Sequence, residues 1–189
     1  MKCFFALVAC FVCVASAMVC AQTTASSAQA APAGPTKDPV ATSLRTLLPR
    51  SRNNTLGAIT AMPADKFSYK PTPDQMTFGH LVVHIVESNN LLCSKTADVP
   101  APTVAELKDT DSKDKLLAAA TASYDFCGDA LSKMDDSKLG DSVELFGGRK
   151  FPRAMGALFL AGGWADHYAA AAQDLRLNGI LPPSAQPKK

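Results

Sequence analysis

Three histidines are the residues of this chain whose type and spacing could hold a metal ion. His80 and His84 are four residues apart, which places two imidazoles one turn apart on the same side of a helix. His167 lies far downstream in a second segment with helical spacing of apolar residues. Three imidazoles with one open position are typical of catalytic zinc, and nickel accepts the same ligands. If the two segments meet, we expect a divalent metal, zinc or nickel, at His80, His84 and His167.

A second interpretation of these histidines stays open. In it His80 is a surface residue, while His84 and His167 are polar residues at the margin of the core. The spacing alone is weak evidence for a metal, because the residues between His80 and His84 are apolar and the glutamate of the metalloprotease pattern is absent.

Three other side chains are weaker candidates. Glu87, about one turn after His84, could orient a ligand, and Trp164 and Tyr168 could line a pocket. Each also has an ordinary explanation, as an exposed helix acid or as aromatic core residues. No residue is assigned as catalytic, because the chain has no defensible Ser-His-Asp pattern, no glycine-rich phosphate loop and no reactive-cysteine signature.

The charge of the chain argues against a nucleic-acid partner. The formal net charge is +2, from 19 basic and 17 acidic residues, and no stretch gathers Lys or Arg into a basic face. We expect a small-molecule ligand or substrate, which the sequence does not identify.

The first 21 residues have the layout of a secretory signal peptide. Lys2 precedes an apolar run, and small residues end it at Ala21, where we expect cleavage. The mature protein would then be exported, to the periplasm or outside the cell, with no membrane segment. An uncleaved membrane anchor and a lipoprotein attached at Cys20 are the alternatives.

The cysteines support one disulfide in an exported chain. Four of the six lie within residues 1–21, which leaves Cys93 and Cys127. These two lie on different predicted helices, so a bond between them would join helix to helix. Two buried free thiols are the alternative.

Apolar periodicity predicts an all-α fold. Residues 22–37 are rich in Ala, Thr, Ser and Pro and are typical of a flexible linker. Helical patterns follow within residues 38–62, 74–96, 112–134 and 152–178, with a kink or break expected near Leu48 because Pro49 follows it. Strand patterns are not found, and residues 137–150 are expected to form a long connection. We therefore predict a four-helix bundle over residues 38–183, with long connecting loops and a disordered tail at 184–189.

Several local phrases resemble one known family. They are MPADKFSYKPTP at 62–73, MTFG at 76–79, HIVESN at 84–89, HY at 167–168 and LRLNGILPP at 175–183. Together they resemble the DinB superfamily (damage-inducible DinB-like, related to YfiT) over most of the mature chain.

The resemblance implies a four-helix bundle with an up-down-down-up arrangement, often a homodimer. It implies a divalent metal held at one end by one histidine of the second helix and two of the fourth, at i and i+4. Characterised relatives include thiol-dependent transferases and isomerases that use bacillithiol, mycothiol or glutathione, in which the metal is thought to generate the thiolate.

The ligand pattern of the family is carried over with one departure. His84 matches the ligand of the second helix, and His167 matches the second ligand of the fourth. The first ligand of the fourth helix falls at Gly163, which has no side chain. Either His80 replaces it, giving an exported metal-dependent transferase or hydrolase that acts on a small molecule, or the site is degenerate and the bundle is a non-catalytic binding or scaffold protein.

Overall fold

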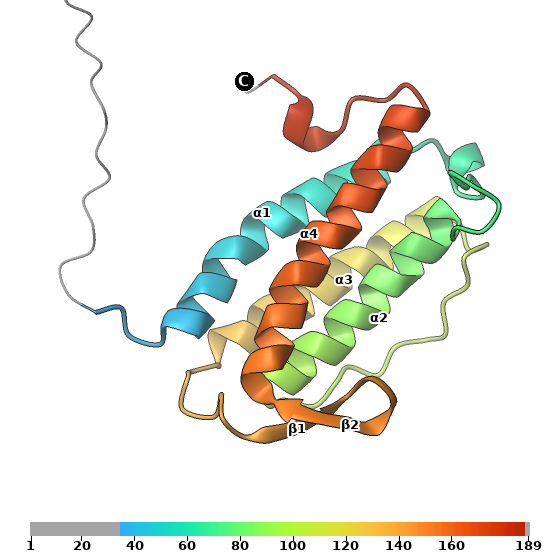
Figure 1. The fold of residues 1–189 in the computed structure, drawn as a ribbon. Coiled ribbons are helices and arrows are strands. Elements are labelled where there is room, and N and C mark those ends of the chain that lie inside the picture. The colour runs from blue at the N-terminus through green and yellow to red at the C-terminus, as the bar shows by residue number, and fades with distance from the viewer. Residues whose placement is uncertain (1–34, 188–189) are drawn as a thin grey trace, which may run out of the picture. The chain divides into compact units, whose positions relative to one another are not determined.

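The computed structural model describes residues 35–187, and these form the predicted four-helix bundle (Figure 1). Its helices are α1 (Pro39–Ala61), α2 (Phe78–Ala97), α3 (Lys113–Ser132) and α4 (Arg153–Leu177). Figure 1 shows α1 and α4 running one way and α2 and α3 the other, which is the up-down-down-up arrangement. Each helix packs on two neighbours: α1 and α2 both contact α3 and α4. Because α2 and α3 are parallel, residues 98–112 must return along the whole bundle.

Polar side chains fix where the helices begin. Thr77 accepts a hydrogen bond from the backbone N–H of His80, and Ser112 accepts one from that of Lys115, so both hydroxyls cap a free amide of the first turn. The Asp136 carboxylate, beyond the end of α3, accepts bonds from the first amides of α1 at 2.8 and 2.9 Å. The Asp136 contact also joins the start of α1 to the segment that follows α3.

We expected a kink or a break near Leu48, and the helix does not break there. α1 continues through Pro49 for 23 residues. Buried residues lie on both sides of the proline, with Leu44 before it and Ile59 after it in one core. Packing of both halves against the same neighbours offsets the backbone hydrogen bond that the proline removes.

A small hairpin lies in the segment that we expected to be a long connection without strands, so the expectation of no strands is wrong. β1 (Ser142–Leu145) pairs antiparallel with β2 (Arg149–Pro152) across the turn η2 (Phe146–Gly148). Gly147 and Gly148 have φ of 69° and 81°, values that favour glycine, so this Gly-Gly pair makes the turn. The strands are four residues long. β1 buries alternate side chains and β2 buries none, so the sequence carries no strand pattern long enough to be recognised.

The core is joined by a disulfide and a short polar network. Cys93 of α2 pairs with Cys127 of α3 as predicted, with Cα atoms 5.3 Å apart. Asn89 of α2 joins the two neighbouring helices. The indole N–H of Trp164 on α4 donates to its side-chain oxygen at 3.0 Å, and its amide N–H donates to the Ser123 hydroxyl on α3 at 3.1 Å. Asn89 is thereby satisfied at both ends, as a buried amide requires.

Order continues past Pro183, where we expected the tail to begin. Pro183–Ala185 form the 3-10 turn η3. The hydroxyl of Tyr168 donates to the Ser184 hydroxyl at 2.6 Å and accepts from its backbone N–H at 2.9 Å, so α4 holds this turn. The expected signal peptide and most of the expected linker lie outside the described residues. Among the helices that the structure describes, none is long and apolar enough to span a membrane.

Gly79 lets two connections cross the start of α2. Its backbone N–H donates to the Phe67 carbonyl at 2.8 Å, and a Cβ at this position would overlap the carbonyl oxygen of Asp109.

We expect Gly79→Ala to lower the free energy of unfolding by about 2 kcal/mol, measured by urea denaturation, because neither backbone segment can move freely. Gly128→Ala is the matched control: its Cβ meets Leu48 at 3.7 Å, an ordinary contact, so the gain in helix propensity should leave stability equal or higher. Equal effects of the two variants would contradict this view of Gly79.

Candidate functional site

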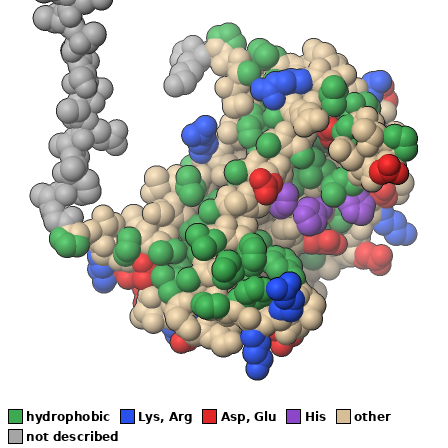
Figure 2. Space-filling model, viewed as in Figure 1, with side chains coloured by type: hydrophobic (Ala, Val, Ile, Leu, Met, Phe, Trp, Pro, Cys, Tyr) green, Lys and Arg blue, Asp and Glu red, His purple; other side chains and the backbone are tan. Residues whose placement is uncertain are grey.

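His84 and His167 meet between α2 and α4. Their rings contact edge to face, with centroids 4.8 Å apart and an interplanar angle of 79°. Both side chains are half-buried, and His84 Nε2 lies 3.5 Å from the Ser88 hydroxyl one turn later. Figure 2 shows histidine side chains on one face of the bundle with acidic side chains around them. The structure thus brings together one imidazole from each of two neighbouring helices.

His80 takes no part in this ring contact. It is in the first turn of α2 and is exposed, and it is not among the residues that line the adjoining pocket. Its backbone N–H is used by the Thr77 cap. Within residues 35–187, no three side chains of the His, Cys, Asp and Glu types are grouped closely enough to hold a metal ion.

A pocket of about 540 Å³ opens beside the two imidazoles. The loop before α2 forms one wall, and α2 and α4 form the others. Its lining contains three carboxylates and two imidazoles but no Lys or Arg, together with apolar and amide side chains. The full lining is Pro71, Asp74, Gln75, Met76, Leu81, His84, Asp166, His167, Ala170, Gln173 and Asp174.

Asp174 is the most unusual member of this lining. It is only 5% exposed, and it forms no ion pair with any described residue. Burial raises the pKa of its carboxyl to about 6. Sequence reasoning missed Asp174, although its spacing of seven residues from His167 places both on one side of α4 and could have identified it.

His167 also has an unsatisfied atom. Its Nδ1 is buried and has no hydrogen-bond partner among the described residues. Burial first, and then the nearby His84, lower its pKa to about 4, while Asp166 acts in the opposite direction. The ring is therefore neutral at pH 7, with one nitrogen able to accept a hydrogen bond.

The other candidate residues lie outside the pocket lining. Glu87 is exposed on α2. Trp164 is buried in the core network with Asn89, and Tyr168 holds the C-terminal turn through Ser184. The contacts of Trp164 and Tyr168 are structural.

The sequence model of the DinB superfamily matches residues 47–171. The chain belongs to the DinB superfamily. Two solved DinB-like proteins share its fold: one from Bacillus cereus ATCC 10987, with a TM-score of 0.60 and 18% identity over 74% of this chain and 93% of that one, and one from Bacillus subtilis, with a TM-score of 0.61 and 19% identity over 77% and 99%. No curated protein matches the chain.

The residues present do not fit the three-imidazole metal site that the DinB resemblance implied. His84 and His167 supply two donors. A Cβ built at Gly163 would lie 3.5 Å from Cε1 of His167, so this position faces the pair but offers no donor. Because no described group of His, Cys, Asp and Glu side chains brings a third donor to this pair, the set stays at two imidazoles, one fewer than a catalytic zinc site of this type uses.

Proposed function

We propose that this DinB-superfamily member is a non-catalytic binding protein whose pocket beside His84 and His167 takes a small, positively charged organic molecule such as an amine. The observation that supports the proposal is the Asp174 carboxylate, buried in the pocket lining without a cationic partner. A buried carboxylate is costly unless a cation or hydrogen-bond donors compensate it. No Lys or Arg lines the pocket, so a cationic ligand would supply the positive charge that compensates this carboxylate.

The rest of the lining suits the same class of ligand. Asp74 and Asp166 add negative charge, and the neutral His167 ring can accept a hydrogen bond from an ammonium group. Met76 and Leu81 give an apolar surface for a hydrocarbon part. A few polar groups in a partly apolar cavity are typical of a small-molecule site.

Calorimetric titration with benzylamine and its neutral analogue benzyl alcohol tests this function. In Asp174→Asn we expect benzylamine affinity to fall about tenfold or more, because a charge-assisted contact is lost, while benzyl alcohol affinity stays unchanged. The matched control is Asp129→Asn at an exposed position of α3, which should alter neither affinity. Benzylamine binding that is absent in the native chain, or equal in native and Asp174→Asn chains, would overturn the proposal.

The same titration should depend on pH in a defined direction. The raised pKa of Asp174 means that its carboxylate forms as pH rises through about 6, so benzylamine affinity should increase between about pH 5 and pH 7. Asp74, Asp166, His84 and His167 also face the pocket. Asp174→Asn retains these four groups. The part of the pH dependence that the native chain shows and this variant lacks therefore reports the titration of Asp174 alone.

A metal-dependent transferase or hydrolase is the second candidate function. The contact between His84 and His167 and the unpartnered Nδ1 of His167 favour it. About one zinc or nickel ion per native chain, lost in His84→Ala, would support this candidate over the binding function.

We also infer that the protein is exported, and the Cys93–Cys127 pair supports this because structural disulfides persist in oxidising compartments.

A further inference from the structure

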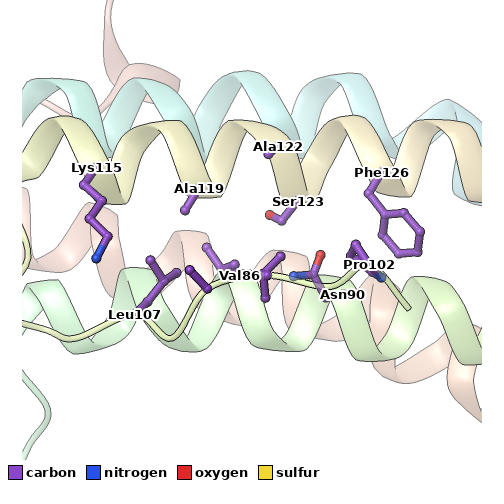
Figure 3. Close-up of a pocket in the computed structure, with 11 residues that line it drawn as sticks. Val86, Asn90, Pro102, Leu107, Lys115, Ala119, Ala122, Ser123 and Phe126 are labelled. Carbon is purple, nitrogen blue, oxygen red and sulfur yellow. The ribbon is translucent and has the colours of Figure 1, made fainter. Parts of the chain in front are cut away.

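A second pocket, of about 300 Å³, lies between α2 and α3 and is covered by the connection that follows α2 (Figure 3). It shares no residue with the histidine pocket. Its lining is mostly apolar and is drawn from all three segments: Val86, Asn90, Pro102, Val104, Ala105, Leu107, Lys115, Ala119, Ala122, Ser123 and Phe126.

Asn90 is the one buried polar group of this lining that lacks a partner. It is 8% exposed, and its Oδ1 is buried without a hydrogen bond to any described residue. The preceding residue shows the contrast: Asn89 points into the core and is bonded to both Trp164 and Ser123. A buried acceptor without a hydrogen bond destabilises the protein, so a bound group that donates to it would recover that free energy.

The other polar side chains around the pocket are already engaged. The Ser123 hydroxyl donates to the Ala120 carbonyl at 2.8 Å and accepts from Asn89. The ammonium group of Lys115 is paired with Asp111 at 2.7 Å. Figure 3 shows Asn90 between the two helices, facing the same space as Ser123 and Ala119. The pocket therefore offers one free acceptor within an apolar cavity.

We propose that this pocket binds a small, neutral, mainly apolar molecule with one hydroxyl group, which donates a hydrogen bond to Asn90 Oδ1. The apolar side chains of α2, α3 and the connection enclose the hydrocarbon part. The volume suits a single aromatic or aliphatic ring, and the absence of an unpaired charge in the lining selects against ions.

The test compares phenol with toluene, which have the same shape and differ in the hydroxyl. Affinities are measured on the purified chain by NMR shift titration, in the native protein and in Asn90→Leu. Leucine keeps approximately the size of the side chain and removes the acceptor. Because a hydroxyl must also leave water, the readout is the change in the phenol-to-toluene affinity ratio between the two chains. We expect this ratio to fall about fivefold or more in Asn90→Leu.

Two further variants make the result decisive. Asn53→Leu makes the same substitution at an exposed position of α1 and should leave the ratio unchanged. Ala119→Leu fills the pocket from α3 and should abolish binding of both probes, with a thermal midpoint equal to or above that of the native chain. The proposal is overturned if neither probe binds the native chain, if the ratio is unaltered by Asn90→Leu, or if binding survives Ala119→Leu. None of these outcomes depends on the function of the histidine pocket.

Discussion

Gly163→His is expected to give the His84–His167 pair a third imidazole and a much higher affinity for zinc. The new imidazole would lie four residues before His167 on α4, and its Cβ would be in van der Waals contact with the His167 ring. Together with His84 it would complete three nitrogen donors from two helices, the number that tetrahedral zinc sites commonly combine with one open position. Mutation of a residue that only hydrogen-bonds to a metal ligand typically lowers metal affinity about 10–100-fold. Adding a third ligand should therefore raise zinc affinity at least ~100-fold.

The experiment is a zinc titration of chelator-free protein, with metal content measured after dialysis. Gly162→His is the matched control, because it adds the same imidazole to the same helix at an exposed position where no other group lies within 4 Å. It should bind zinc no better than the native chain. Adding His84→Ala to Gly163→His should remove the gain. Histidine has a higher helix propensity than the glycine it replaces at either position, so a thermal scan should show folded protein in each case.

Two results would contradict this account. Stoichiometric zinc in the native chain would mean that His80 or a carboxylate completes the site. Equal zinc binding by Gly162→His and Gly163→His would mean that the added imidazole acts as a surface ligand. The comparison therefore tests whether the family site has lost a ligand at one position while its geometry persists.

The four helices were accessible from the sequence for local reasons. The capping residues Thr77 and Ser112 and the apolar period are local signals, and tertiary packing agrees with them. The resemblance to the DinB superfamily then indicated that His84 and His167 lie together at one site. Pro49 shows the opposite case, because burial on both sides of it overrides a local helix-breaking signal.

The two pockets could not be predicted in the same way. Asp174 and Asn90 are ordinary polar residues of helices until a loop or a connection closes over them. Which residues a connection of this length covers is decided by contacts far apart in sequence, such as the approach of Asp109 to Gly79. The Asp174 spacing was visible, but its burial was not.

Removing the disulfide is the second change with a large expected effect. Cys93 and Cys127 are fully buried and close a loop with a sequence separation of 34. In the chain-entropy model, a loop of this length contributes about 3–4 kcal/mol by restricting the unfolded chain. We expect the double substitution to alanine to lower the free energy of unfolding by about that amount in urea. The m-value should rise, because the unfolded chain becomes more expanded.

The single substitutions decide whether the loss comes from a bond or from packing. If the two sulfurs are bonded, Cys93→Ala, Cys127→Ala and the double variant all break the same link and should be destabilised by similar amounts. Losses that add in the double variant would indicate two independent thiols. The same measurement bears on export, because a chain made in a reducing compartment would lack this contribution until oxidised. The test uses protein recovered from the oxidising compartment. An N-terminus at Gln22 would support the proposed signal peptide, and the absence of titratable thiols in the unfolded chain would support the disulfide.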